Sequence, residues 1–236
     1  MELTPLGDCA VLLRVAENFE SEAERALQQV MAAQRRLASA KIPGVVEVAP
    51  AYTTVAIFYD PLKVVAGGGP VENIFGWLEK RIREVISRTE SIGFESKTSE
   101  VEIPVCYDGE FGFDLDHVAQ GAGIDRDQVI DLHSGGHYRV HCLGFIGGFP
   151  FLGGLPGKLA TPRRESPRKE IPAGSVGIGG KQTGIYPIKS PGGWNIIGRT
   201  PWRLFDPQRN PPGLLRAGDQ VRFRRINRDE FERLIK

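Results

Sequence analysis

The sequence has few cysteines and lacks the features that mark several common classes of protein. Cys9, Cys106 and Cys142 are odd in number, widely spaced and in no CxxC pair, so they indicate neither a disulfide framework nor a zinc site. The formal net charge of +1 gives no general attraction to nucleic acid or membranes. No stretch approaches the uncharged length that spans a bilayer, and the N-terminus lacks a secretory signal. We therefore expect a cytoplasmic protein with reduced thiols.

A complete phosphate-binding loop is absent as well. Gly174–Thr183 is rich in glycine and contains Gly180-Lys181, which invites comparison with the Walker motif. However, Ser175 occupies the required earlier glycine position, and Gln182 stands where Ser or Thr would bind magnesium. Consecutive glycine amides could still form a nest that binds an anion. We predict no independent nucleotide site of the Walker type.

The histidines do not predict a metal site. His133, His137 and His141 are spaced by four, but Gly135-Gly136 ends the helix before His137, and no carboxylate or cysteine stands at matching spacing. On a strand starting near Tyr138, alternation places His141 on the face toward solvent or a cleft. A lone histidine is more often a surface or packed residue than a catalytic one, so His141 is a candidate only.

The N-terminal part of the chain alternates strand and helix patterns. In order, they cover residues 10–15 (strand), 21–39 (helix), 45–48 and 53–59 (strands), and 71–85 (helix). This order is that of a split βαβ sandwich of ferredoxin-like type, which one further strand would complete. Residues 99–106 could supply that strand or could open the next domain. The polar stretch 87–100 is the best linker, and we place the domain boundary between residues 94 and 95.

The C-terminal part changes character along its length. Asp114 and Asp125 can cap two short helices. From Tyr138 onward, short β-type runs alternate with Gly and Pro turns, at residues 138–145, 175–178, 183–188, 194–198, 202–204 and 220–225. This pattern is typical of a small β-barrel or sandwich. Within it, Tyr138–Pro207 is dense in Gly and Pro, which predicts a turn-rich surface that presents polar groups from fixed positions.

One loop of this region suits recognition of an anion. Arg163 and Arg164 lie between Pro162 and Pro167, and the prolines stiffen the loop, so less entropy is lost when the two guanidiniums are presented. Such a rigid pair suits bidentate recognition of carboxylate or phosphate. The plain alternative is a solvated basic loop. Trp194 would either wall a pocket nearby or sit in the core, which is the default for a single Trp.

Several sequence blocks resemble a known family. They are PLGDCAVLL (5–13), LGFIGGFPFLGGL (143–155), LATPRRESPR (159–168), IPAGSVGIGGKQTGIYP (171–187), SPGGWNIIGRTP (190–201) and LFDP (204–207). Their order and spacing resemble the carboxyltransferase family that comprises the B subunit of bacterial 5-oxoprolinase, also known as allophanate hydrolase subunit 1 and as the inhibitor of the sporulation histidine kinase. The chain departs from the usual pattern at Gly147 (usually Pro), Gly179 (usually Ala) and Phe151 (usually Tyr).

The resemblance implies a fold, partners and a reaction. The fold would be α+β, with a small ferredoxin-like α/β domain (1–94) followed by a cyclophilin-like β-barrel (95–236). The chain would pair with a homologous larger subunit and a third subunit, and the complex would use ATP to open 5-oxo-L-proline to L-glutamate. This chain alone would bind no cofactor. Alternatives are a regulatory inhibitor that docks on a histidine kinase, a subunit of an allophanate- or urea-type amide hydrolase or carboxyltransferase, and, from fold alone, a proline-binding or prolyl isomerase module.

The resemblance also implies a set of cleft residues by matching motif position. They are His141, Gln182 and Tyr186 in catalytic roles, and Arg163, Arg164 and Trp194 in substrate binding. Arg163 would hold the substrate carboxylate, and Gln182 would bind the lactam amide. No metal ligand is among them.

Overall fold

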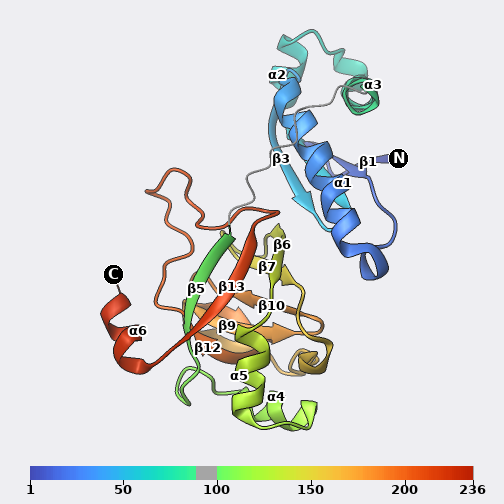
Figure 1. Ribbon diagram of the computed structural model, residues 1–236. Helices are drawn as coiled ribbons and strands as arrows, with labels where there is room; N and C mark the ends of the chain where they lie inside the picture. The colour runs from blue at the N-terminus through green and yellow to red at the C-terminus, as the bar shows by residue number, and fades with distance from the viewer. Residues whose placement is uncertain (89–99, 236) are drawn as a thin grey trace. The chain divides into compact units, whose positions relative to one another are not determined.

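The chain divides into two compact units, Met1–Lys97 and Thr98–Lys236 (Figure 1). The structure is a computed structural model that describes residues 1–88 and 100–235. The boundary predicted between residues 94 and 95, and most of the predicted linker 87–100, lie outside the described residues. No helix within the described ranges is long and apolar enough to cross a membrane.

The first unit is a four-stranded antiparallel sheet with helices. Its elements are β1 (Glu2–Pro5), β2 (Ala10–Arg14), α1 (Phe19–Ala40), β3 (Val45–Ala51), β4 (Thr54–Tyr59), α2 (Pro61–Ala66), η1 (Val71–Asn73) and α3 (Ile74–Ser87). The strand order is β1-β2-β4-β3. The fourth strand of the ferredoxin-like sandwich is therefore β1. The described part of the strand expected over 99–106 is Glu100–Cys106, which belongs to the second unit.

Apolar spacing explains how the helices of this unit cover the sheet. Val30 and Leu37 on α1 and Leu78 and Ile82 on α3 recur at helical intervals, and all are buried. They share one hydrophobic cluster with strand residues such as Ile57. Burying that face, rather than intrinsic propensity, supplies most of the stability of such helices.

The second unit is a closed β-barrel. Its elements are β5 (Glu100–Cys106), α4 (Leu115–Ala122), α5 (Arg126–Ser134), β6 (Tyr138–Leu143), β7 (Pro150–Gly153), η2 (Gly157–Leu159), β8 (Arg168–Ile171), β9 (Ser175–Gly179), β10 (Gln182–Ile185), β11 (Ser190–Gly192), β12 (Asn195–Arg199), β13 (Gln220–Ile226) and α6 (Arg228–Leu234). The strand order is β6-β13-β5-β12-β9-β10-β7, and β7 pairs with β6 to close the ring. Only the β13–β5 pair within this ring is parallel. The expected mixed α/β fold with a barrel is confirmed, and the barrel-or-sandwich alternative resolves to a barrel.

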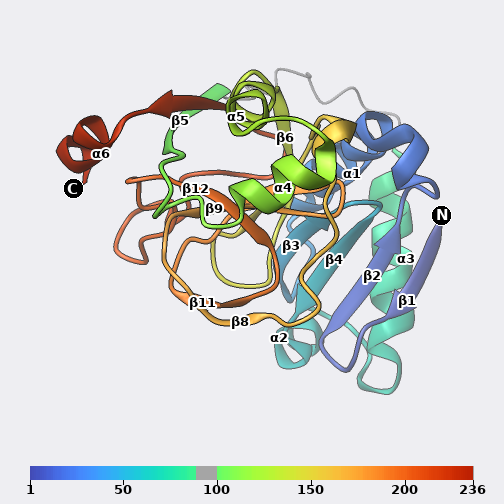
Figure 2. The ribbon, with the colours of Figure 1, turned by 90° about the horizontal axis from the view of Figure 1, so that it is seen from below.

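The barrel interior is filled by β-branched and aliphatic side chains. Val140, Ile178 and Ile197 are fully buried in it, and residues of α4 and α5 join the same cluster. These two helices lie beside each other and cover one end of the barrel (Figure 1 and Figure 2). Asp125 caps α5 with a reciprocal capping box, as its position before the helix predicted.

Expectations for the turn-rich region have mixed outcomes. The β-type runs expected at 175–178 and 183–188 coincide with β9 and with most of β10, which pair as a hairpin. Residues 202–204 do not form a strand, since the Trp202 N–H donates to Thr200 Oγ1, at 3.2 Å, and not to a neighbouring strand. The region is built from barrel strands as much as from turns.

Candidate functional site

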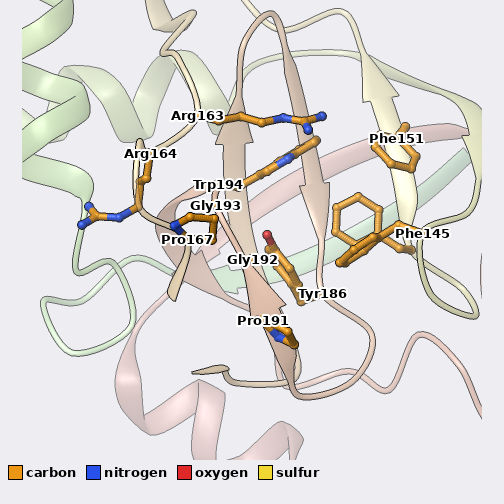
Figure 3. Close-up of a pocket in the computed structure, with 11 residues that line it drawn as sticks. Phe145, Phe151, Arg163, Arg164, Pro167, Tyr186, Pro191, Gly192, Gly193 and Trp194 are labelled. Carbon is orange, nitrogen blue, oxygen red and sulfur yellow. The ribbon is translucent and has the colours of Figure 1, made fainter. Parts of the chain in front are cut away.

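A cavity of about 350 Å³ lies against the barrel wall (Figure 3). Three segments line it together with Tyr186: the β6–β7 turn and β7 (Phe145, Phe149, Phe151), the loop before β8 (Arg163, Arg164, Pro167), and residues 191–194. Below the cavity lies a small hydrophobic cluster that is separate from the barrel interior. Four of the six predicted site residues, Arg163, Arg164, Tyr186 and Trp194, therefore meet at one place.

Aromatic rings form the floor of the cavity. Phe149 stands at the centre, with its ring edge-on to Tyr186 at 5.1 Å and to Trp194 at 5.4 Å between centroids. Phe151 tilts against Phe149 at 4.8 Å. Such edge-to-face pairs fix ring positions beyond what area burial alone would do. The floor is therefore a rigid apolar surface on which a small flat molecule can rest.

Two glycines make room for these rings. A Cβ at Gly179 would lie 2.6 Å from Trp194 Cε2, and a Cβ at Gly192 would overlap the Tyr186 hydroxyl. At Gly179, one of the three departures from the family pattern, the Trp194 ring in this chain fills the space that an alanine methyl would need.

Replacing Gly192 by Ala is expected to destabilise the barrel unit by about 1–3 kcal/mol, because the new methyl must displace Tyr186 in a packed cluster. Gly157→Ala is the matched control, since nothing lies within 4 Å of a Cβ at that position. Urea unfolding followed by Trp fluorescence measures both variants. Equal stability of the two variants would show that Tyr186 moves aside without cost.

Arg163 brings to the cavity a positive charge that no carboxylate of the described residues neutralises. Its Cζ lies 5.7 Å from the centroid of the Trp194 ring, which is within the range of a cation–π interaction. Figure 3 shows the side chain extended above that ring. Within residues 1–88 and 100–235, no carboxylate forms an ion pair with Arg163 and no hydrogen bond engages its guanidinium. The group is therefore available to an anion that enters the cavity.

The neighbouring arginines are already paired with a buried carboxylate. Asp114, which is 4% exposed, accepts from Arg168 Nη1 at 2.8 Å and Nη2 at 2.7 Å and from Arg164 Nη1 at 3.1 Å. Arg164 accordingly points away from Trp194 (Figure 3). The side chain of Asp114 does not cap α4, contrary to the sequence prediction, because its oxygens serve the arginines and the Ile196 N–H. Arg164 lines the wall, and its predicted role in binding substrate stays a prediction.

The loop that carries Arg163 is held by backbone hydrogen bonds. The Arg164 N–H donates to Gly193 O at 2.7 Å, and Asn195 Nδ2 donates to Pro162 O at 2.8 Å. Thr161 and Gly180 form an isolated β-bridge. These bonds tie the loop to β9 and β12, so its prolines are only part of the reason that it holds one shape.

Tyr186 is a buried hydroxyl that stays protonated near neutral pH. Burial raises the pKa of Tyr186, while a hydrogen bond from the Trp194 backbone and the charges of Arg163 and Arg168 act to lower that pKa. The net direction is upward, because desolvation of the phenolate is the largest effect. Tyr186 can therefore orient a ligand as a neutral group.

The remaining two predicted residues do not line this cavity. His141 is the extra residue of a bulge in β6, between the pairs Val140↔Leu152 and Cys142↔Phe151, and it is only 4% exposed. The ring lies over Gly153, the strand partner of Arg139, so it is on the same face as Arg139, as alternation predicted, but it is buried and does not face solvent. Gln182 begins β10 opposite Gly179. The catalytic roles of both residues stay predictions.

Sequence reasoning missed the phenylalanines and Asp114. The phenylalanines stood in a block that was noted for its glycines, and their aromatic spacing was the available signal. Asp114 is 50 residues from Arg164 and gave no signal beyond its place before a helix. Among the described residues, no group of three or more His, Cys, Asp or Glu is placed to hold a metal ion.

Comparison with known proteins gives consistent matches. Residues 1–215 match the family described as carboxyltransferase domain, subdomain C and D. The chain is 44% identical over 235 residues to the B subunit of 5-oxoprolinase from Bacillus subtilis, covering 98% of this chain and 95% of that protein. It is 41% identical over 218 residues to the B subunit of 5-oxoprolinase from Escherichia coli O157:H7, covering 92% and 93%. The crystal structure of TTHA0988 superposes with a TM-score of 0.76 at 37% identity, over 92% of this chain but only 40% of that longer chain.

Proposed function

This chain belongs to the carboxyltransferase domain, subdomain C and D family, and from that premise we propose that it is the B subunit of an ATP-dependent 5-oxoprolinase. The observation that carries the proposal is the uncommitted guanidinium of Arg163 above an aromatic floor. It stands in a chain that is similar over nearly its full length to two proteins of that name.

The cavity matches the chemistry of 5-oxo-L-proline. That substrate carries one carboxylate on a small five-membered lactam ring. The carboxylate accepts two hydrogen bonds from Arg163, which a planar guanidinium supplies with good geometry. The ring rests against Trp194 and Phe151, and the apolar surroundings strengthen the charged contact. The cavity, at about 350 Å³, is of the size that small ligands occupy.

The reaction needs more than this chain supplies. Water adds to the lactam carbonyl carbon, the ring C–N bond breaks, and the nitrogen leaves as the amino group of L-glutamate while ATP is hydrolysed. The chain has no complete Walker loop, so in this proposal ATP is handled by a homologous larger subunit or by a third subunit. The greater length of TTHA0988, of which this chain matches 40%, supports a site that further polypeptide completes.

Reconstitution tests the proposal. The chain is co-expressed with the larger subunit and the third subunit, and the purified complex is assayed for glutamate and ADP formed from 5-oxo-L-proline and ATP. We expect both products in equal amounts, and neither when any subunit is omitted. A stable complex that forms no glutamate would overturn the proposal, and turnover of allophanate or urea instead would favour the amide-hydrolase alternative.

A further inference from the structure

Asp114 joins three parts of the barrel unit that are distant in sequence. It precedes α4, it binds Arg164 of the loop between η2 and β8 and Arg168 at the start of β8, and its Oδ2 accepts from the Ile196 N–H of β12 at 2.7 Å. The Asp114 N–H in turn donates to Ile196 O at 2.8 Å. Ile196 lies two residues after Trp194, so this carboxylate ties the cavity floor to the arginine loop.

The ion pairs at Asp114 have the geometry of a clamp. Arg168 meets the carboxylate at two points, and its Cζ also lies 4.5 Å from the centroid of the Phe113 ring. Two-point contacts between guanidinium and carboxylate fix orientation as well as distance. Because Asp114 is buried, these contacts are poorly screened by solvent, unlike those of surface pairs. Arg164 and Arg168 bracket the loop segment next to Arg163, so the clamp limits where Arg163 can stand.

The clamp also distinguishes the three arginines, since two of them pair with Asp114 and Arg163 does not. Asp114 engages the guanidiniums of Arg164 and Arg168, while among the described residues the guanidinium of Arg163 contacts the face of Trp194 and no carboxylate. We infer that Asp114 is a positioning residue, which holds the arginine loop so that Arg163 alone is presented to the carboxylate of the substrate. The inference deepens the proposed function and rests on it for the identity of that substrate.

Replacing Asp114 by Asn tests whether Asp114 positions Arg163, because loss of positioning should change KM and leave kcat nearly unchanged. An asparagine offers one acceptor oxygen and no charge, so it cannot retain Arg168, Arg164 and the Ile196 N–H together. In the assembled complex, Asp114→Asn is expected to raise KM for 5-oxo-L-proline by about tenfold or more, with kcat within about threefold, since displacement of a binding group by about 1 Å has effects of this order. Asp114→Glu, which keeps the charge, should bring KM back toward the wild-type value.

Asp116→Asn is the matched control. Asp116 lies two residues along the chain at the start of α4, its side chain is 79% exposed, and its only described ion pair is with Arg126. Its KM should equal that of the wild type. If Asp114→Asn does not fold, Arg168→Lys tests the same clamp, because it keeps the charge and loses the two-point contact; KM should then rise about threefold.

A second readout does not depend on the reaction. Trypsin cleaves after Arg163 and Arg164 only when the loop leaves its anchored shape, and the rates at these bonds in the full chain are followed by mass spectrometry. We expect about tenfold faster cleavage there in Asp114→Asn than in Asp116→Asn. Wild-type values of both KM and cleavage rate in Asp114→Asn would overturn the inference. Faster cleavage in a chain whose wild-type complex forms no glutamate would support the clamp and reject the proposed function.

Discussion

Replacing Arg163 by Gln should raise the KM of the assembled enzyme for 5-oxo-L-proline by about 100-fold. The guanidinium is the uncommitted cation of the cavity, and a charge-assisted contact with a carboxylate contributes about 1.5–3 kcal/mol. Gln retains a donor but neither the charge nor the two-point geometry. Since the interaction is made with bound substrate and transition state alike, kcat should change much less than KM.

Two further variants make this result specific. Arg163→Lys keeps the charge and loses the planar fork, so its KM should fall between those of the wild type and Arg163→Gln. In Arg164→Gln, Asp114 keeps its two contacts with Arg168, and the lost pair involves a side chain that is 36% exposed. We expect its KM to rise no more than about fivefold. An equal rise in KM for Arg163→Gln and Arg164→Gln would show that the substrate does not distinguish the two guanidiniums.

The elements that sequence reasoning placed well are those whose pattern is local. The helix expected over 21–39 corresponds to α1, Phe19–Ala40. It could be predicted because its apolar stripe and polar face recur at helical spacing in the sequence itself. The strands β7, β8 and β11 were missed because they are only three or four residues long and lie among glycines and prolines. Strand β1, which pairs with β2, was missed for a different reason. No local pattern indicates that residues 2–5 form a strand antiparallel to β2.

The site residues also fall into those with a local sequence signal and those without one. Arg163 and Trp194 were found because they stand in specific sequence blocks, and the structure brings them to one cavity. The burial of His141 could not be predicted, since no local pattern shows that its ring packs over Gly153 of the neighbouring strand. Asp114 could not be found either, since its partners lie across long separations in sequence.

A buried histidine of the same unit lies in a hydrogen-bond network that requires its neutral form. His133 is fully buried, with Nδ1 at 2.8 Å from the Tyr107 hydroxyl and Nε2 at 3.0 Å from Thr183 Oγ1. Because the Thr183 hydroxyl donates to Gly177 O, its oxygen accepts from Nε2–H, and Nδ1 accepts from Tyr107. The network is complete only while the imidazole is neutral, and Phe223 stacks on the ring at 4.5 Å.

Lowering the pH should therefore destabilise the barrel unit through His133. Burial lowers the pKa of His133 from 6.5 to about 3, so below pH 6.5 the unfolded chain binds a proton that the folded chain does not. The free energy of unfolding should fall by about 1.4 kcal/mol per pH unit below 6.5, or about 2.7 kcal/mol by pH 4.5, and this contribution should be constant above 6.5. Urea unfolding between pH 7.5 and 4.5 measures it.

The experiment is sharpest with barrel-specific fluorescence and a variant that does not titrate. In a Trp77→Phe background, the remaining fluorescence comes from Trp194 and Trp202, both in the barrel unit. His133→Gln lowers stability at every pH through lost stacking, but it removes the titration, so its profile between pH 6.5 and 4.5 should be flatter than that of the parent by about 1.4 kcal/mol per unit. Parallel profiles for the two proteins would show that the buried imidazole takes up its proton without unfolding the barrel, and that the network around it adapts to the charge.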